Sequence, residues 1–315
     1  MITVIAGGVG AARFLTGLVQ VRPPEEITAV VNVGDDTELH GLSISPDLDT
    51  ITYTLAGEID PERGWGLAGE TWQAMETLGR LGGHTWFNLG DRDLGTHLYR
   101  TARRREGAPL SQVTAEVTAG WGLEIVLLPA TDDRLRTMLT IEGDDGRPTE
   151  IGFQEYFVQR QHSVPVRAIR FDGADEARPG PGVLEAIDEA ECVVIAPSNP
   201  LISIDPVLAV SDVRDAVTAA RERTVAVSPI VAGEALKGPA DRLLTELGHI
   251  PTVVGVAELY APLASTLVID EADAALAPAV EASGLRCVVA PTVMSSPRIA
   301  AELADTVLDS IAPVV

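Results

Sequence analysis

Two segments near the start of the chain have the residue types and spacing for phosphate chemistry. The turn Gly7-Gly8-Val9-Gly10 follows an apolar run at residues 2–6, and an acid-rich segment follows at residues 32–50. Glycines at the end of a strand let backbone N–H groups approach a phosphate. Carboxylates nearby can hold the Mg²⁺ that neutralises such a phosphate. Together the two segments indicate a nucleotide site with metal-assisted phosphate chemistry.

The acid-rich segment offers two pairs of aspartates. Asp35 and Asp36 follow a β-branched run, so we expect them at the carboxyl end of a buried strand, where open α/β sheets bind ligands. Asp47 and Asp49 are two residues apart, and in an extended segment both side chains would point to one side and face one cation. A solvated loop with Asx-turns is the alternative interpretation. All four aspartates stay candidate ligands at this point.

Three later loops offer further polar groups. The turn at residues 88–93 is suited either to holding a planar ring or to capping the following helix. Ser198 and Asn199 directly follow a predicted strand and offer hydroxyl and amide contacts to phosphate or base. Lys237, the only lysine, also follows a predicted strand and is a candidate phosphate ligand. Ordinary turns and solvated surface are the alternatives for these residues.

The elements that must position these residues follow an α/β pattern. The first 35 residues predict a strand, a helix and a strand, which form a βαβ unit with a right-handed crossover. Continuous apolar runs fit parallel strands that are covered on both faces. Further strands are predicted at 192–196, 224–227, 252–256, 266–269 and 287–290, and helices between them and at 71–81, 97–106 and 296–310. The predicted fold class is α/β, with a doubly wound, mostly parallel Rossmann-like sheet.

The pattern changes between residues 112 and 175. Short β-rich runs are predicted at 115–118, 124–128, 138–141 and 168–171, with a helix at 151–161. We therefore predict an inserted α+β lobe at 112–175, and a Rossmann-like nucleotide-binding core made of 1–111 and 176–315.

Composition excludes several classes of protein. The net charge of −23 over 315 residues argues against nucleic acid and against an anionic membrane surface as partners. No apolar run reaches the roughly 20 residues that span a bilayer. A core strand begins at Ile2 with no basic leader before it, and Cys192 and Cys287 lie in apolar runs typical of buried strand thiols. These features predict a cytoplasmic protein.

The sequence gives little support for covalent catalysis or for a dinucleotide site. The five histidines show no metal spacing, and the sequence contains no Gly-x-Ser-x-Gly elbow. Arg13 stands where the dinucleotide fingerprint has its third glycine, which argues against an NAD(P) dehydrogenase. The turn is also not a P-loop, because no Gly-Lys-Ser/Thr follows it.

Taken together, the motifs resemble the CofD-type transferases of coenzyme F(420) biosynthesis, the 2-phospho-L-lactate transferase family. The ordered set is specific and runs from residue 1 to about residue 300. It comprises Gly7–Gly10, Asn32–Asp36, Ser45–Thr50, Leu89–Asp93 with Thr96 and His97, Ile151–Tyr156, Ala196–Pro200, and Ser228–Ile230 with Lys237–Pro239.

The resemblance implies a reaction. Members of the family join Fo (7,8-didemethyl-8-hydroxy-5-deazariboflavin) to a phosphorylated three-carbon acid carried on guanosine diphosphate. The ribityl hydroxyl of Fo attacks, GMP leaves and Mg²⁺ is required. Archaeal members carry lactate, whereas the actinobacterial branch uses enolpyruvyl-diphospho-guanosine and forms dehydro-coenzyme F(420)-0. The amino-acid composition of this chain, with one lysine among 23 basic residues, is typical of a GC-rich genome and favours the actinobacterial branch. The resemblance also implies a homodimer.

The resemblance further implies roles for residues of this chain. Gly7, Gly8, Val9 and Gly10 would bind the nucleotide, with N–H groups of residues 8–10 on the pyrophosphate. Ser198, Asn199 and Lys237 would hold the same ligand. The segments at 46–50 and 89–93 favour this transferase over a related branch of nucleotide-sugar-binding regulators, which is the alternative.

The same comparison implies the catalytic residues. Asp36 and Asp49 would be catalytic and hold Mg²⁺, with Asp47 as the alternative ligand, and Asp49 would orient or deprotonate the attacking hydroxyl. Asp49 and Asn88 would contact Fo, although some relatives carry lysine where this chain has Asn88. Replacing Asp49 by alanine is expected to abolish turnover with little loss of fold.

Overall fold

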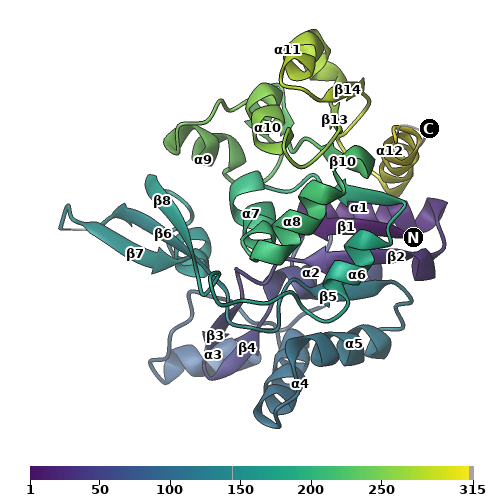
Figure 1. Cartoon of the computed structure of the whole chain (residues 1–315). Helices are drawn as coiled ribbons and strands as arrows, with labels where there is room; N and C mark the ends of the chain where they lie inside the picture. The colour runs from purple at the N-terminus through teal and green to yellow at the C-terminus, as the bar shows by residue number, and fades with distance from the viewer. Residues whose placement is uncertain (144, 312–315) are drawn as a thin grey trace.

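The computed structural model describes residues 1–143 and 145–311; positions 144 and 312–315, which fall in the predicted lobe and core, lie outside that description. A seven-stranded sheet runs through the middle of the molecule (Figure 1), in the order β14-β13-β10-β9-β1-β2-β5. Every neighbouring pair in it is parallel. The strands are β1 (Ile2–Ala6), β2 (Ile27–Val31), β5 (Val126–Pro129), β9 (Cys192–Ile195), β10 (Thr224–Val227), β13 (Thr266–Ile269) and β14 (Arg286–Val289).

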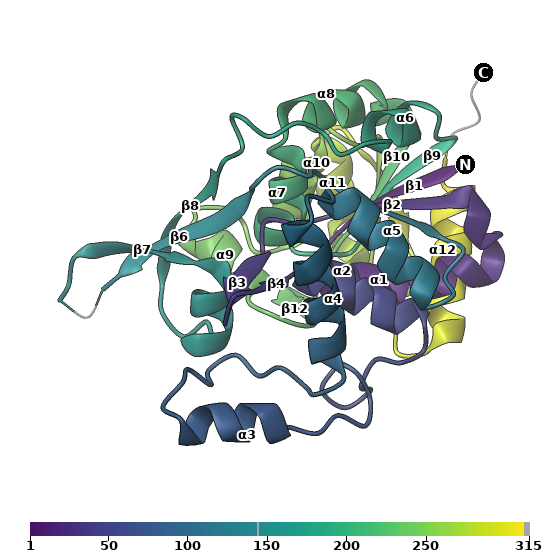
Figure 2. The same ribbon diagram turned by 90° about the horizontal axis from the view of Figure 1, so that it is seen from below.

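Helices cover both faces of this sheet, which is why its central strands are continuous apolar runs. All residues of β1, β2 and β9 are buried. On one side, α1 (Gly8–Val21) packs against α2 (Pro46–Leu55) and α12 (Pro297–Asp309). Figure 2 shows α6 (Val183–Asp188) and α8 (Ser211–Ala219) on the opposite side. This arrangement confirms the predicted doubly wound α/β fold.

The chain reverses its direction across the sheet beside β1. After β1 it proceeds to β2 and β5 on one side, whereas β9, β10, β13 and β14 follow on the other. The loops after β1 and β9 therefore flank a switch point at the carboxyl ends of the strands, the place where open α/β sheets bind ligands. They touch closely, since a Cβ added to Gly10 would lie 1.9 Å from the carbonyl oxygen of Pro197.

The segment between β2 and β5 builds one wall of this end of the molecule. It contains a hairpin of β3 (Thr37–Leu39) and β4 (Leu42–Ile44), and a small separate core of Ile44, Met75 and Leu89. Its helices are α2, α3 (Gln73–Arg80), α4 (Asp93–Arg105) and α5 (Leu110–Gly120).

An antiparallel sheet of three strands lies within the predicted lobe and projects from the main sheet (Figure 1). It consists of β6 (Arg136–Glu142) between β7 (Pro148–Gly152) and β8 (Val166–Asp172). The division of the chain at residues 112 and 175 stays a prediction. One element assigned to the lobe belongs elsewhere, however, because β5 pairs with β2 in the central sheet.

Two predicted strands are wrong, because both segments are helical. Residues 115–118 lie in α5, whose buried residues Leu110, Val113, Thr114 and Thr118 have helical spacing that a four-residue window does not show. Residues 252–256 begin α10 (Val253–Tyr260), where the Thr252 side chain accepts a hydrogen bond from Val254 N at 3.3 Å and caps the helix. The β-branched composition predicted a strand there, and tertiary packing decided otherwise.

The predicted helix at 151–161 is partly right. Ile151 and Gly152 end β7, and a π-helix follows at Glu155–Gln159. The two cysteines lie on strands as expected, Cys192 buried and Cys287 half-buried. The remaining helices and strands are α7 (Asp205–Leu208), β11 (Ile230–Val231), β12 (Glu234–Ala235), α9 (Ala240–Glu246) and α11 (Ala277–Ala282). A π-helix lies at Pro200–Ile204, and 3₁₀ helices lie at residues 24–26, 221–223 and 271–276.

Candidate active site

A cavity of about 820 Å³ opens at the switch point of the sheet. Its floor is formed by the glycine turn and the start of α2, and the loops that follow β9, β10 and β14 add further wall residues. Aromatic side chains line another part of it, among them Trp65, Trp86, Phe87, Phe153 and Phe157. A cavity that combines an apolar wall with a few polar groups is typical of small-molecule sites.

The glycine turn is the N-terminus of α1. Gly7 is the N-cap residue in an extended conformation, and Gly8 has φ +67°, which favours glycine. The N–H groups at the start of a helix have no partner within the helix and point toward a bound anion. The Asp47 carboxylate lies against this turn, because a Cβ added to Gly7 would lie 3.1 Å from Asp47 Oδ2. The turn is therefore a helix N-terminus with Asp47 directly beside it, and its role as a phosphate site stays a prediction.

Asp47 and Asp49 do not lie in an extended segment, and the prediction that both face one cation for that reason is wrong. Both belong to the first turn of α2, which begins at Pro46. Residues two apart on a helix point about 200° away from each other. Asp47 accepts a hydrogen bond from Asn32 Nδ2 at 2.9 Å, whereas Asp49 is held by Arg100 on the other side.

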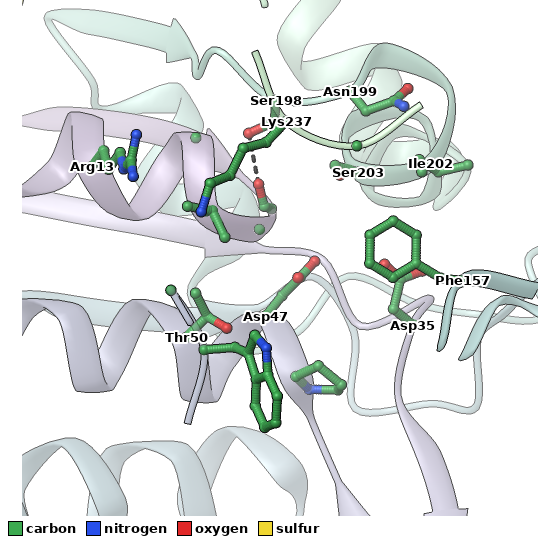
Figure 3. A pocket seen from close by; sticks show the side chains of 18 of the residues that line it. Arg13, Asp35, Asp47, Thr50, Phe157, Ser198, Asn199, Ile202, Ser203 and Lys237 are labelled. Atoms are coloured by element: carbon green, nitrogen blue, oxygen red, sulfur yellow. Dashed lines mark hydrogen bonds between the residues drawn. The ribbon is translucent and has the colours of Figure 1, made fainter. Parts of the chain in front are cut away.

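Asp35 joins Asp47 at the cavity floor (Figure 3). Burial, together with the charge of Asp47, raises the pKa of Asp35 well above its ordinary value. Burial also raises the pKa of Asp47 to about 6. One oxygen of Asp35, Oδ1, is buried without a hydrogen-bond partner. Two close carboxylates with an unused oxygen fit a hard divalent cation such as Mg²⁺, because the cation would relieve their repulsion.

Asp36 faces a different environment. It lines a second, smaller cavity of about 210 Å³, and its Oδ2 accepts a hydrogen bond from Ser45 Oγ at 2.8 Å. Burial raises the pKa of Asp36 to about 7, although the nearby charges of Arg136 and Arg100 oppose the shift. Asp35 lines both cavities, so Asp36 lies next to the main site but behind it. Its predicted role as a metal ligand stays a prediction.

Asp49 lines the main cavity with a buried ion pair at its back. Arg100 Nη1 lies 3.1 Å from Asp49 Oδ2, and Arg100 Nη2 donates to Oδ1, so the pair is bidentate. Burial lowers the pKa of Arg100, but the charge and hydrogen bonds of Asp49 raise it further, so the pKa lies above its ordinary value and Arg100 stays a cation. The guanidinium engages both oxygens of Asp49 and makes this carboxylate a poorer candidate for metal binding than Asp35 or Asp47.

The network continues below Asp49. His97 Nε2 lies 3.2 Å from Asp93 Oδ2, and the Tyr53 hydroxyl donates to Asp93 Oδ1 at 2.6 Å. Ligand atoms of Asp49, Asp93 and His97 all lie within 4.8 Å of one another, a spacing that a metal ion could use. Arg100 and Tyr53 already satisfy the two carboxylates, however, so we interpret the cluster as a hydrogen-bonded support.

Two cations stand at the glycine turn without a carboxylate partner. Lys237 and Arg13 line the cavity near Asp47 (Figure 3), and neither forms an ion pair within residues 1–143 and 145–311. Burial, with the nearby Arg13 charge, lowers the pKa of Lys237. Unpaired cations beside a helix N-terminus suit a pyrophosphate. Lys237 and Arg13, which the sequence did not single out as a ligand, therefore both line the cavity, and the role of Lys237 as a phosphate ligand stays a prediction.

The predicted nucleotide residues after β9 also line the cavity. Ser198 Oγ donates to Gly7 O at 2.6 Å and so ties this loop to the glycine turn. Asn199 Oδ1 accepts a hydrogen bond from Leu201 N at 3.0 Å and caps the π-helix that follows. Each side chain thus makes a local hydrogen bond and also lines the cavity. An ordinary turn and a ligand-binding loop are therefore compatible interpretations of this segment.

Asn88 lies at the exposed side of the cavity next to Trp86 and Phe87. The turn around Asn88 is held to the start of α3 by Asp91. Asp91 accepts hydrogen bonds from Gln73 N and Ala74 N, both at 3.1 Å, and so caps α3. The predicted capping role is therefore real but serves a different helix. Whether Asn88 contacts Fo stays a prediction.

The structure adds residues that sequence reasoning missed. Arg100, Asp93 and Tyr53 belong to the support of Asp49, and none was singled out as a site residue. A signal for two of them was present, since Asp93, His97 and Arg100 have the i, i+4, i+7 spacing of one helix face. A buried face with three ionisable side chains is unusual for a surface helix.

A parallel α/β sheet with a glycine turn, paired carboxylates and unpaired cations at its switch point is typical of Rossmann-like proteins that bind phosphorylated ligands. A sequence profile described as 2-phospho-L-lactate transferase CofD matches residues 2–288. The chain belongs to the CofD family, a family of transferases.

Individual relatives agree with this assignment. A phosphoenolpyruvate transferase of Streptomyces griseus is 44% identical over 310 residues, covering 98% of this chain and 97% of that protein. One of Mycolicibacterium smegmatis is 42% identical over 324 residues, covering 98% of both. A crystal structure of a Bacillus halodurans protein has a TM-score of 0.63 at 19% identity over 98% of each chain, which shows the shared fold. Within the described residues, none of the helices has the length and apolar character to cross a membrane.

Proposed function

We propose that this protein transfers the phosphoenolpyruvyl group from enolpyruvyl-diphospho-guanosine to the ribityl hydroxyl of Fo. The hydroxyl oxygen forms a bond to the phosphorus next to the acid, the bond from that phosphorus to GMP breaks, and dehydro-coenzyme F(420)-0 forms. Relatives named phosphoenolpyruvate transferase, at 42–44% identity over almost the whole chain, support this choice of group.

The single observation that carries the proposal is the composition of the 820 Å³ cavity. It combines a helix N-terminus and cations, which suit a phosphate, with aromatic side chains and carboxylates in one cavity. Phosphoryl transfer needs mainly positioning and charge neutralisation, and little covalent work from the protein. A guanosine diphosphate group at the glycine turn and a planar deazaflavin at Trp65, Trp86 and Phe87 would bring their reacting ends together near Asp47 and Asp49.

Specific residues would divide the work. N–H groups of the glycine turn, Arg13 and Lys237 would bind and orient the pyrophosphate, and Ser198 and Asn199 would contact the nucleotide. Asp49 would accept a hydrogen bond from the attacking hydroxyl and orient it.

We further propose that Asp35 and Asp47 hold Mg²⁺, because they are the carboxylate pair with an unused buried oxygen at the cavity floor. When bound, Mg²⁺ supplies charge neutralisation at the phosphates. Asp36 and Asp49 stay predicted ligands, and the experiment below applies to them as well.

Thermal unfolding with GDP and MgCl₂ should show a Mg²⁺-dependent rise in Tm that Asp47→Asn removes. Asp212→Asn, an exposed change on α8, should keep it.

The decisive experiment measures binding of Fo by quenching of its fluorescence, with GDP and Mg²⁺ present or absent, followed by transfer from enolpyruvyl-diphospho-guanosine. Saturable binding and formation of dehydro-coenzyme F(420)-0 are expected. Failure to bind Fo, with binding of a nucleotide sugar instead, would contradict the proposal and favour a regulatory ligand-binding protein.

A further inference from the structure

One buried arginine holds the carboxylate that faces the proposed attacking hydroxyl. Arg100 is 3% exposed and comes from α4, more than 50 residues away in sequence from its partner Asp49. Its two Nη atoms bind the two oxygens of Asp49, and Nη1 also lies 3.5 Å from the Ser43 carbonyl oxygen. A bidentate guanidinium fixes the plane of a carboxylate, which a single hydrogen bond does not.

His97 in turn fixes the arginine. Nδ1 of His97 lies 3.4 Å from Arg100 Nη1, and a guanidinium can only donate, so Nδ1 acts as the acceptor. Nε2 of the same ring lies 3.2 Å from Asp93 Oδ2. The Tyr53 hydroxyl completes the chain at Asp93. Contacts therefore run in sequence from Tyr53 at one end, through Asp93, His97 and Arg100, to Asp49 at the other.

This support leaves Asp49 able to act. Each carboxylate oxygen has two acceptor positions, and Arg100 occupies one on each. The remaining positions are available on a side chain that lines the cavity. Because Arg100 and His97 themselves stand behind Asp49, they influence a reaction in the cavity through its orientation.

We propose that Arg100 is a positioning residue for the transfer reaction and that His97 fixes Arg100 through Nδ1. The inference rests on the proposed function, in which Asp49 orients the attacking hydroxyl. A misplaced group of this kind can lower the rate about 10²-fold while leaving binding of the rest of the substrate intact. The residues should therefore affect kcat much more than the KM for the guanosine donor.

The first test compares two arginine-to-lysine changes on the same helix. Arg100→Lys keeps the positive charge and loses the bidentate fork, so kcat should fall about 10²-fold with little change in the KM for enolpyruvyl-diphospho-guanosine. Arg103 forms a bidentate pair with Glu116 at 2.8 Å but lies at the surface, so Arg103→Lys is the matched control and should keep wild-type kcat.

A second pair of variants at His97 keeps the inference testable if Arg100→Lys does not fold. Glutamine retains one acceptor and one donor, whereas leucine fills a similar volume without either. His97→Gln should therefore keep more of the wild-type kcat than His97→Leu, in samples shown to be folded by circular dichroism. A purely structural role would make kcat follow only the folded fraction, independent of acceptor chemistry.

The outcomes separate this inference from the proposed function. Wild-type kcat in folded Arg100→Lys, or equal kcat values for the two His97 variants, would overturn the positioning role while transfer by the wild-type protein stands. If the wild-type protein transfers nothing to Fo, the proposed function fails and this inference fails with it.

Discussion

The four aspartates of the acid-rich segment face four different environments. Asp47 lies beside the glycine turn and accepts a hydrogen bond from Asn32, and Asp35 keeps an unused oxygen beside it. Asp36 faces a neighbouring cavity, and Asp49 is paired with Arg100. One residue type thus serves as candidate metal ligand, buried acid and oriented acceptor, because neighbours decide which protonation state and which contacts each side chain has.

The ion pair changes what we expect of Asp49→Ala. The substitution should abolish turnover, but it also leaves the Arg100 charge buried without its partner, so the free energy of unfolding should fall by about 3–5 kcal/mol. Denaturant unfolding measures this loss. The double change Asp49→Ala with Arg100→Met removes both charges and should recover part of the stability. An unfolding midpoint for Asp49→Ala equal to that of the wild type would contradict the buried pair.

The raised pKa of Asp36 predicts a pH dependence of stability. Because the folded-state pKa, about 7, lies above the ordinary value of 3.8, the folded protein holds this proton more tightly than the unfolded chain. The resulting stabilisation is complete below about pH 4 and is lost as the pH rises toward 7. Without Mg²⁺, Tm should therefore fall between about pH 4 and 7, and Asp36→Asn should make the fall shallower. Identical slopes for the two proteins would disprove this.

At the scale of elements, the site depends on two helices that begin at the same place. The first turns of α1 and α2 meet at Asp47, which belongs to α2 and lies against Gly7 and Gly8 at the start of α1. Both helix N-termini contribute positive potential there, which favours bound anions. The loop after β9 closes this arrangement through the bond from Ser198 to Gly7.

The close contact of this loop with α1 predicts the effect of Gly10→Ala. The new Cβ would lie 1.9 Å from the Pro197 carbonyl oxygen, so the loop or the helix must move. We expect a loss of stability of about 1–3 kcal/mol and weaker binding of GDP. Calorimetry of GDP binding and denaturant unfolding measure the two effects.

Gly95→Ala is the matched control for this change. Gly95 lies in α4 with open space at its Cβ position, so alanine there should stabilise by about 0.5–1 kcal/mol and leave GDP binding unchanged. Equal effects of the two substitutions would show that crowding at Gly10 is not the cause.

At the scale of the whole molecule, the cavity gathers residues from positions 7 to 295 of the chain. The glycine turn and Arg13 come from the start of α1 and Lys237 from the loop after β12. The carboxylates come from the segment after β2, and Phe153 and Phe157 from the projecting lobe. The chain carries a net charge of −23, yet two cations without ion-pair partners within the described residues stand at the phosphate-type end of the cavity. Local arrangement, not net charge, therefore decides which ligand the site attracts.

The homodimer stays a prediction that the family resemblance implies. Sedimentation equilibrium should give a mass of twice the 33.2 kDa of the chain at micromolar concentration. A mass of one chain over the whole accessible concentration range would contradict it. Because this experiment does not involve ligands, its result is independent of the proposed reaction.

Much of the fold could be predicted from sequence because its signals are local. Continuous β-branched runs identified β1, β2, β9, β10 and β13, and a glycine turn after β1 located the start of α1. The errors at 115–118 and 252–256 arose where short β-branched segments adopt helices, since packing outweighs intrinsic preference there. The ordered motifs identified the family, because their order along the chain is itself a property of sequence.

Which side chains meet was decided only by the tertiary structure. The sequence determined that Asp47 and Asp49 lie two residues apart, but the helical start of α2 sends them to different neighbours. Asp49 meets Arg100 across 51 residues, and Asp35 meets Asp47 at the cavity floor. Spacing along a chain describes side chains of one element, whereas contacts between elements depend on how their buried faces pack. That is why the sequence by itself determined the family and the sheet, and packing determined the support of the site.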